Sequence, residues 1–543
     1  MTLPRLGRAR TRRLLCLVAG AAAALAFPPF GFLPGLLGYG LLMHLIERPF
    51  VAEGGVGTLK SAFLAGWLAG LAFFAIGVWW VAEAFLVDAV HQGWMAPFAV
   101  MLLAGGLALF WGLGAVLYVQ LKGRSVWRAI IFAGCFAAVE WLRGNLLTGF
   151  PWNLPGETFR AGSAPSQGAA LIGSYGMTWL VLAVSAGLTV VREGRKGLIA
   201  ASLAALSLAG LFGYGQARLH HAAAPLDGAP IVRIVQANVP QSAKYDEAMF
   251  YDIVSRYTRL TPSPGKPADL VIWPEGALPT ALEDYLAPGT WTREAIARAL
   301  TPDQTLIVGG YRQEKGRYYN SLLALHGPQL TVQGRYDKFR LVPFGEFLPL
   351  EPLWGGVKQL VAVGDGFSPG PPPAAMSIGK GLPLIQPLIC YESLFPGFTR
   401  EGTRRTGQRA HLIVNISNDA WFGATSGPLQ HLNLASYRAI EEGLPLVRAT
   451  PTGVSAIVDA YGRTVPTRFL GLGKMGALEG SIPPSLPSSL YSAWGNTLFL
   501  VLLFLSSSTV LLIDGRQRLR DETWLTQACG RFSRPGRNKN RDV

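Results

Sequence analysis

Three residues that lie far apart in the sequence carry side chains suited to acyl transfer. Cys390 lies in a Leu-Ile-Cys-Tyr-Glu run, Glu275 follows a Leu-Val-Ile-Trp-Pro run, and Lys338 lies in a loop-like segment at 336–349. Apolar, β-type residues before Cys390 and Glu275 predict that each of these residues follows the end of a strand. A thiol, a carboxylate and an ammonium that converge from such positions would form a site for nucleophilic acyl transfer.

Each of the three side chains has a possible task in that chemistry. A thiol with an ordinary pKa is mostly protonated, so Cys390 needs a nearby base. Glu275 suits this task because its Trp-Pro neighbours reduce its contact with water, and loss of water raises the pKa of a carboxyl group. Lys338 would stabilise the oxyanion of a tetrahedral intermediate. Taken singly, each residue also has a structural explanation, as a buried thiol, a helix cap and a solvated lysine.

Other polar residues accompany these three in the sequence. Glu346 and Glu392 are acidic residues in apolar surroundings, and each would hold Lys338 or substrate in place or serve as a structural ion-pair partner. The polar segment 415–423 and His431 would line the same cleft or form a buried polar turn. The residue types alone leave these alternatives open.

The remaining cysteines do not indicate a disulfide framework or a metal site. Cys16 and Cys135 fall inside apolar stretches, and Cys529 lies in a basic C-terminal segment. No Cys-x-x-Cys motif and no His-rich spacing occurs in the sequence, and these are the usual signatures of structural metal sites. We therefore expect no metal.

The composition indicates a membrane protein. Of the 543 residues, 50% are hydrophobic and only 15% are charged, and the mean hydropathy is +0.30, whereas soluble proteins carry about a quarter charged residues. A formal net charge of +15 would suit a nucleic-acid partner. However, the basic residues lie mainly at the termini and in short links between apolar stretches, which is the pattern of a membrane topology signal. No nucleic-acid partner is expected.

Apolar runs that approach the roughly 20 residues needed to cross a bilayer predict about eight transmembrane helices. They lie near 14–30, 32–46, 61–82, 94–121, 126–142, 171–191, 197–214 and 495–513. We expect a seven-span region at 1–214, a folded domain at 222–490, a last transmembrane helix at 495–513 and a basic tail at 514–543. The first run also has features of a cleavable signal peptide, but the apolar chain continues at once into a second span.

The distribution of Lys and Arg predicts the orientation of these spans. Basic residues precede the first span and follow the second, fourth, sixth and last, whereas the alternate links contain few of them. Basic links stay in the cytoplasm, so both termini are predicted to be cytoplasmic. Seven crossings then leave the long polar block on the opposite side of the membrane.

The polar block alternates β-type runs with helical ones, which predicts a layered α/β domain. The predicted strands are 231–238, 269–273, 305–310, 321–325, 384–390, 411–417, 445–450 and 454–459. The predicted helices are 246–260, 291–300 and 428–443, and the last of these opens with Gly-Pro, a favourable first turn.

In the order Glu275, Lys338, Cys390, the runs Trp-Pro-Glu-Gly, Asp-Lys-Phe-Arg-Leu-Val-Pro-Phe-Gly-Glu and Ile-Cys-Tyr-Glu resemble the Glu–Lys–Cys triad of the nitrilase superfamily. With its predicted spans, the chain resembles the membrane-embedded branch of that superfamily, the apolipoprotein N-acyltransferase family. This resemblance implies a helical membrane bundle joined to an extracytoplasmic, nitrilase-like αββα sandwich. It implies Cys390 as the nucleophile, Glu275 as the general base and Lys338 as the group that stabilises the intermediate.

The same resemblance implies residues that support the site or bind substrate. They are Glu346, Tyr391, Glu392, Tyr245, Asn320, Trp421 and His431. Tyr245 departs from the family pattern, because the family often has Trp in a Lys-Trp-Asp-Glu run where this chain reads Lys-Tyr-Asp-Glu.

The resemblance further implies a ping-pong reaction at the periplasmic face of the bacterial inner membrane, without a cofactor. A membrane phospholipid, typically phosphatidylethanolamine, would acylate Cys390, and the amine of a diacylglyceryl apolipoprotein would take the acyl group from the thioester. Two alternatives stay open. A membrane-tethered nitrilase-type amidase would use the same triad. A transporter would use the spans, but these contain few of the ionisable residues that usually mark a transport pathway, with Glu140 and His44 as the nearest candidates.

Overall fold

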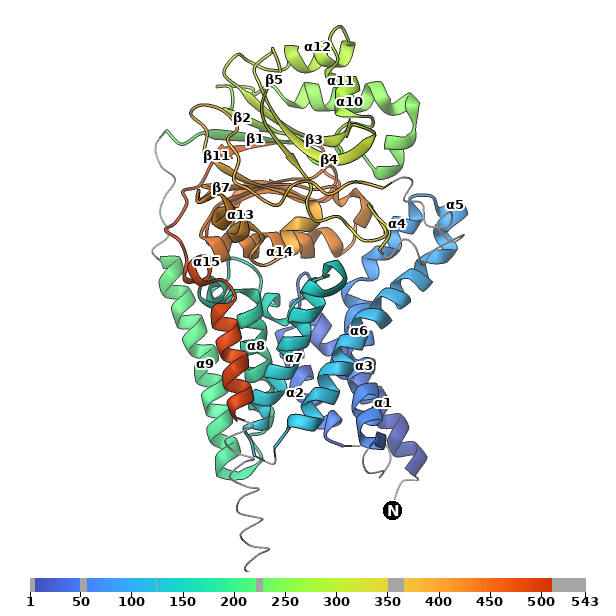
Figure 1. Ribbon diagram of the computed structural model, residues 1–543, viewed down its shortest axis with the longest axis vertical. Helices are drawn as coiled ribbons and strands as arrows, with labels where there is room; N and C mark the ends of the chain where they lie inside the picture. Colours follow the sequence, from blue (N-terminus) through green and yellow to red (C-terminus); the bar gives the residue numbers. More distant parts are fainter. Residues whose placement is uncertain (1–4, 49–55, 124, 221–227, 350–365, 510–543) are drawn as a thin grey trace, which may run out of the picture.

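The computed structural model describes residues 5–48, 56–123, 125–220, 228–349 and 366–509. Figure 1 shows a bundle of helices in one half of the molecule and a domain of two stacked sheets in the other, with both regions joined along a broad face. The predicted tail at 514–543 and the last residues of the expected final span lie outside the described residues.

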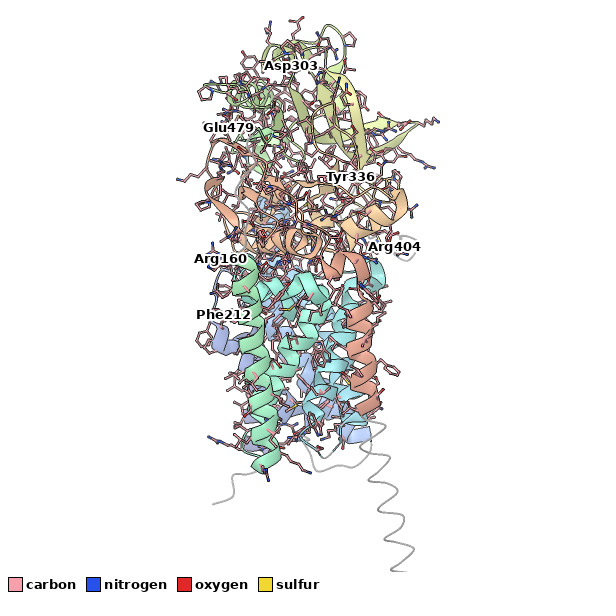
Figure 2. All side chains as sticks on the ribbon, turned by 90° about the vertical axis from the view of Figure 1, so that its left-hand side faces the viewer. Arg160, Phe212, Asp303, Tyr336, Arg404 and Glu479 are labelled. Atoms are coloured by element: carbon pink, nitrogen blue, oxygen red, sulfur yellow. The ribbon has the colours of Figure 1, made fainter. Side chains whose placement is uncertain are left out.

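The helical region is built from apolar helices that are joined by short, more polar links. Its elements are α1 (Arg5–Leu25), α2 (Leu37–Ile46), α3 (Val56–Gly77), α4 (Ala82–Leu86), α5 (Ala89–Gln92), α6 (Ala96–Leu121), α7 (Arg128–Asn145), α8 (Ala169–Thr189) and α9 (Gly194–His220). Small residues allow close packing, since a Cβ on Gly20 would lie 1.8 Å from the Ala69 carbonyl oxygen. Outward-facing side chains are apolar as well. Phe212 on α9, 49% exposed, is an example that Figure 2 labels.

The prediction of about eight spans is not confirmed. Within the described chain, five helical stretches are long and apolar enough to cross a membrane, namely Gly57–Gly77, Ala89–Leu121, Arg128–Thr148, Pro165–Thr189 and Gly194–His220. The first expected span is cut short because α1 ends at Leu25, before the Pro28-Pro29 pair, and because its first turns carry arginines. The second and last correspond to the shorter apolar helices Leu33–Ile46 and Thr497–Thr509.

The sheet domain contains a six-stranded and a five-stranded sheet. Its strands are β1 (Ile231–Gln236), β2 (Leu270–Ile272), β3 (Thr305–Glu314), β4 (Arg317–His326), β5 (Thr331–Asp337), β6 (Ile385–Ile389), β7 (Leu412–Ile416), β8 (Leu446–Ala449), β9 (Ser455–Val458), β10 (Thr464–Leu470) and β11 (Gly476–Ser481). The strand orders are β11-β1-β2-β3-β4-β5 and β10-β9-β8-β7-β6. The eight predicted strands all correspond to observed ones, with ends shifted by a few residues.

Helices cover the outer faces of the two sheets, which gives the predicted αββα sandwich (Figure 1). The helices α10 (Phe250–Leu260), α11 (Leu282–Leu286) and α12 (Trp291–Arg298) lie on the first sheet. The helices α13 (Phe398–Thr406) and α14 (Gly427–Glu442) lie between the second sheet and the helical region, and α15 (Leu490–Trp494) leads back to that region.

Alternation of side chains along the strands creates separate cores on the two faces of each sheet. On β7, Leu412 and Val414 join the core between the sheets, whereas Ile413 belongs to the core on the outer face. That outer core also contains Trp80 and Trp152 from the helical region. The second sheet is therefore packed against the helices through a continuous apolar layer.

Buried charges also join the two regions. The guanidinium of Arg438, on α14, donates to Glu157 at 2.7 Å, and Glu157 lies in the link between α7 and α8. Glu441, also on α14, accepts hydrogen bonds of 2.8 Å from the backbone N–H and the hydroxyl of Ser174 on α8. These four residues are fully or almost fully buried, so the interface is a sealed interior and not a surface contact.

Candidate active site

Strand direction brings the candidate residues to one edge of the sandwich. Strands β1, β2 and β3 are parallel, and β5 runs in the same direction because β4 is antiparallel to both β3 and β5. Glu275 follows β2 and Lys338 follows β5, so both lie at the carboxyl edge of the first sheet. Cys390 follows β6 at the carboxyl edge of the second sheet. Ligands of parallel sheets usually bind at such edges.

Glu275, Lys338, Glu346 and Asn320 form one buried cluster. The Lys338 ammonium lies 2.9 Å from Glu346 Oε1 and 3.5 Å from Glu275 Oε1. The Asn320 amide donates to both carboxylates, at 2.6 Å to Glu275 and 2.8 Å to Glu346. Each of the four residues is less than 10% exposed. The single amide and the single ammonium therefore hold two carboxylates in a fixed relation.

The carboxylates keep Lys338 charged. Burial alone would lower the pKa of this ammonium, but the charges of Glu346 and Glu275, together with the hydrogen bond to Glu346, raise it above its ordinary value. Glu346 is itself held by the backbone N–H of Val342 at 2.8 Å. A fixed positive charge at this place is suited to an oxyanion, which gains most from a cation in a dry site.

The second carboxylate oxygen of Glu275 faces the other sheet. Glu275 Oε2 accepts a hydrogen bond of 2.6 Å from the backbone N–H of Asn418, which follows β7. This contact shows that the carboxyl edges of the two sheets meet. Close approach requires a glycine on β3, because a Cβ on Gly309 would lie 2.7 Å from Glu275 Cα and 2.6 Å from Ile416 Cδ1.

Cys390 sits on a sharp turn between β6 and a short helix (Cys390–Leu394). Its φ of +50° lies in the left-handed region, which is unfavourable for a residue with a side chain. A nucleophile on such a strand-to-helix turn presents its side chain away from the backbone, as in the nucleophile elbow of hydrolases. Burial and the charge of Glu275 raise the pKa of the thiol, against the opposing charge of Lys338. Cys390 therefore rests as a thiol and needs a base.

Glu392 joins the loop of Lys338 to the turn of Cys390. Its carboxylate accepts hydrogen bonds from the backbone N–H of Ile389 at 2.8 Å and from that of Phe339 at 2.8 Å. The hydroxyl of Tyr336 donates to it at 2.7 Å. Burial raises the pKa of Glu392 to about 7, although these donors oppose the shift. These contacts fix the position of the Lys338 loop relative to the turn of Cys390.

Behind Cys390 lies a chain of buried polar groups. His431 Nδ1 is 3.0 Å from Asp419 Oδ1, and Arg448 donates to Asp419 Oδ2 at 2.7 Å. His431 Nε2 is 3.0 Å from the Ser393 hydroxyl, and this hydroxyl donates to the Cys390 carbonyl at 2.9 Å. The Asp–His–Ser order is that of a hydrolase triad. However, Ser393 is 0% exposed, and its hydroxyl already donates to the Cys390 carbonyl. This row of hydrogen bonds therefore holds the backbone of Cys390 in place.

We expect His431→Leu to lower kcat for acyl transfer by about tenfold or more, because it removes the buried hydrogen bonds to Asp419 and Ser393, and each such loss costs about 1–3 kcal/mol. Burial lowers the pKa of His431 and keeps it neutral, so KM and the pH profile should stay unchanged. His431→Gln, whose amide still reaches Ser393, should restore most of the activity. Steady-state kinetics across pH on both variants provide the measurement. Loss of one limb of the pH profile in His431→Gln would make the histidine a proton carrier and contradict a positioning role.

Two sequence-predicted residues lie apart from this cluster. Trp421 is half-buried and makes no hydrogen bond or ring contact with the described residues. Tyr245 is 68% exposed, and its hydroxyl accepts a hydrogen bond of 3.1 Å from Gln241. Gln241 in turn accepts from the Asn418 side chain at 2.9 Å, so Tyr245 reaches Glu275 only through two intermediates.

Sequence reasoning missed Lys244 and the amide of Asn418. The Lys244 ammonium donates to Asn418 Oδ1 at 3.3 Å, and burial lowers its pKa to about 8 in spite of the charge of Glu275. The position of Lys244 beside Tyr245 was the available signal for the first residue. The polar segment 415–423, which contains Asn418, was predicted to line the cleft, but nothing in the sequence marks the backbone N–H as the functional group.

Comparison with known proteins gives matches to both halves of the chain. Residues 231–486 match the carbon-nitrogen hydrolase family, and residues 19–187 match the apolipoprotein N-acyltransferase N-terminal domain. The chain is 54% identical to an apolipoprotein N-acyltransferase of Caulobacter vibrioides over 502 residues, which cover 91% of this chain and 93% of that protein. The chain belongs to the apolipoprotein N-acyltransferase family. This chain is also 36% identical to a family member from Brucella melitensis over 530 residues, which cover 93% of this chain and 97% of that protein.

Membership in this family agrees with the architecture. The N-terminal match covers the apolar helices α2, α3, α6, α7 and most of α8, and the hydrolase match covers both sheets. The predicted fold class, a helical membrane region joined to a nitrilase-like sandwich, is therefore confirmed. The family is one of acyltransferases, so the predicted enzyme class is confirmed as well.

Proposed function

We propose that this chain transfers an acyl chain from a membrane phospholipid, through a thioester on Cys390, to the α-amine of a diacylglyceryl apolipoprotein. Its relatives from Caulobacter vibrioides and Brucella melitensis are named as apolipoprotein N-acyltransferases. Phosphatidylethanolamine is the proposed donor. The roles of Glu275, Lys338 and Cys390 are likewise proposals, and they rest on the cluster geometry described above.

In the first half-reaction, the Cys390 sulfur attacks the ester carbonyl of the donor while Glu275 takes the thiol proton. The carbonyl oxygen becomes an oxyanion, which the Lys338 ammonium stabilises. Collapse of the intermediate breaks the carbon–oxygen bond, and the departing lysophospholipid oxygen takes the proton from Glu275. The raised pKa of the thiol makes this concerted proton transfer necessary, because little free thiolate exists at neutral pH.

In the second half-reaction, the acceptor amine attacks the thioester carbonyl. Glu275, again unprotonated, takes a proton from the amine nitrogen. The carbon–sulfur bond breaks, and the sulfur regains a proton from Glu275, so the amide product leaves with the enzyme restored. A thioester is reactive enough toward an amine to make this step favourable.

One observation favours lipid substrates over those of a tethered amidase. Tyr391, next to the nucleophile, donates a hydrogen bond from its hydroxyl to the carbonyl of Gly149, at the start of the link between α7 and α8. Trp152 in the same link donates to Gln430 on α14 at 2.9 Å. A domain that is only tethered needs no such contacts, whereas an enzyme whose substrates arrive from the bilayer benefits from a site built on the helix ends.

The decisive experiment is transfer of a labelled acyl chain. Purified full-length protein is mixed with acyl-labelled phosphatidylethanolamine and a diacylglyceryl lipopeptide with a free α-amine. We expect the label on the lipopeptide as an amide, in amounts equal to the lysophospholipid formed. Release of the label only as free fatty acid would favour the hydrolase, and no reaction of either kind would favour the transporter.

We further propose the membrane arrangement that the basic links predict. The segment 1–214 and the helix at 495–513 would lie in the bacterial inner membrane, the domain at 222–490 in the periplasm, and both termini with the tail at 514–543 in the cytoplasm. Exposed Arg192 in the link after α8, and exposed Arg195 and Lys196 in the first turn of α9, support this arrangement.

Labelling of single cysteines tests the proposed orientation. In intact cells with a permeabilised outer membrane, an impermeant thiol reagent should modify Thr331→Cys, on an exposed strand of the sheet domain, and leave Lys196→Cys unmodified. Disruption of the inner membrane should make both positions reactive. Modification of Lys196→Cys in intact cells would invert the orientation and remove the periplasmic assignment.

A further inference from the structure

A cavity of about 320 Å³ lies at the junction of the two regions. Its walls come from the end of α7, from α8, from the loop after Lys338, and from the segment that leads into α13. Figure 2 labels Arg404, which lies on α13, at the level where the helical region meets the sheet domain. If the long apolar helices span a bilayer, this level corresponds to the headgroup layer.

One wall of the cavity carries a cation without an anionic partner. The Arg340 guanidinium lies 4.1 Å above the ring of Phe395 and donates to the carbonyl of Thr148 at 3.2 Å. Its Nε is buried without a hydrogen-bond partner, and no carboxylate within the described residues pairs with it. The oxygens of Glu392, the nearby carboxylate, are occupied by backbone N–H groups and Tyr336.

The surroundings make this cation unusually suited to an anion. Burial lowers the pKa of Arg340 by more than the charge of nearby Glu392 raises it, so its charged form has lost hydration that no direct ion pair with a described residue replaces. A guanidinium with unused donors in such a place gains strongly from a phosphate, which it binds through two parallel hydrogen bonds.

The rest of the lining suits an amphiphile. Arg405 supplies a second guanidinium, and it forms no ion pair with any residue that the structure describes. Phe339, Phe398 and Pro372 supply apolar surface. Glu401 also borders the cavity, 3.7 Å from Arg404 on the exposed side, and would face a positively charged headgroup amine.

We propose that this cavity binds the phosphodiester of a phospholipid headgroup, with Arg340 and Arg405 as its ligands. The site rests on the proposed function in one respect, because it is assigned to the acyl donor. Its walls support that assignment. Phe339 and Arg340 directly follow Lys338, and Phe395 packs edge-on against Tyr391 with ring centroids 5.0 Å apart. The same two loops thus hold the catalytic groups on one side and the cavity on the other.

Direct binding tests the site without turnover. Full-length Cys390→Ser protein in detergent is titrated with dihexanoyl phosphatidylethanolamine, with dihexanoylglycerol, which lacks the phosphate, and with inorganic phosphate, by microscale thermophoresis. We expect the phospholipid to bind about tenfold or more tightly than dihexanoylglycerol. Arg405→Gln should reduce this difference, and Arg340→Gln with Arg405→Gln should abolish it. Lys315→Gln, which removes a positive charge from the exposed turn between β3 and β4 outside the cavity, is the control and should bind as the parent protein does.

Kinetics on the active protein assign the site to the donor. Arg405→Gln and Arg340→Lys should raise KM for phosphatidylethanolamine about tenfold and leave KM for the lipopeptide unchanged, and both are expected to fold because they retain polarity or charge. Unchanged phospholipid binding by the double variant would overturn the proposal. Inorganic phosphate that binds as tightly as the lipid would also overturn it in favour of a free-anion site. Arginine-dependent lipid binding in a protein without acyl transfer would keep the headgroup site and reject the proposed function instead.

Discussion

Cys390→Ala is expected to reduce acyl transfer by about 10⁴-fold or more, since losing a covalent nucleophile leaves only binding and electrostatic contributions. Alanine, like cysteine, has a Cβ, so the steric cost of the φ of +50° at this turn stays the same. The fold and the cluster around Lys338 should therefore be preserved. Intact mass spectrometry after incubation with phospholipid should show one added acyl group on the parent protein and none on the variant.

Two comparisons make this prediction specific to Cys390. Cys135→Ala alters another buried free thiol, in α7 of the helical region, and should leave the acyl adduct unchanged. Cys390→Ser should also fail to turn over, because a hydroxyl is a far weaker nucleophile than a thiol with the same base. An acyl adduct that persists in Cys390→Ala would place the nucleophile elsewhere and refute the proposed mechanism.

Lys338→Ala should lower kcat by about a hundredfold or more, which is the usual effect of removing one oxyanion-stabilising group. The loss has a second cause in this structure. Glu275 and Glu346 share this ammonium at 3.5 Å and 2.9 Å, and without it two buried carboxylates would repel each other. This repulsion would move Glu275 out of the position in which it can act as the base.

Lys338→Arg should not restore activity. The side chain is 1% exposed, and a planar guanidinium does not fit the space of an ammonium between two carboxylates and an amide. Lys315, on an exposed turn between β3 and β4, provides the control. Rates of thioester formation and of aminolysis should both fall in Lys338→Ala and remain at the parent level in Lys315→Ala. Equal rates in the two variants would mean that Lys338 has no catalytic role and contributes only to the structure.

The sequence predicted the inner strands of both sheets and the fully buried edge strand β6, and it missed three others. Those three, β5, β10 and β11, are the remaining edge strands. An edge strand has one solvated side and carries more polar residues, so its apolar alternation is weak, as in the Thr-Val-Gln-Gly-Arg-Tyr-Asp run of β5. Five of the eight predicted spans correspond to helical stretches long and apolar enough to cross a membrane. Hydropathy alone does not register the Pro28-Pro29 pair, which follows the end of α1 at Leu25.

The candidate site divides in a similar way. Glu275 and Cys390 were predictable because each directly follows a recognisable apolar run, whereas Lys338 was found through the loop-like segment 336–349 that carries it. Asn320 and Glu346 were implied by family resemblance, and the structure places both against Lys338. Ser393 and the Asn418 amide had no signal in the sequence, since their contribution comes from tertiary geometry alone.

The buried contacts of Arg438 with Glu157, and of Glu441 with Ser174, bear on how the protein matures in the cell. Cutting the sheet domain from the helices would strand these charges in an apolar surface that includes Leu434 and Ala439, and unpaired buried charges are strongly destabilising. We therefore expect the last layer of the sandwich to complete its folding only when it packs against the helical region. A newly made chain whose helices fail to insert in the membrane should then be inactive and prone to aggregation.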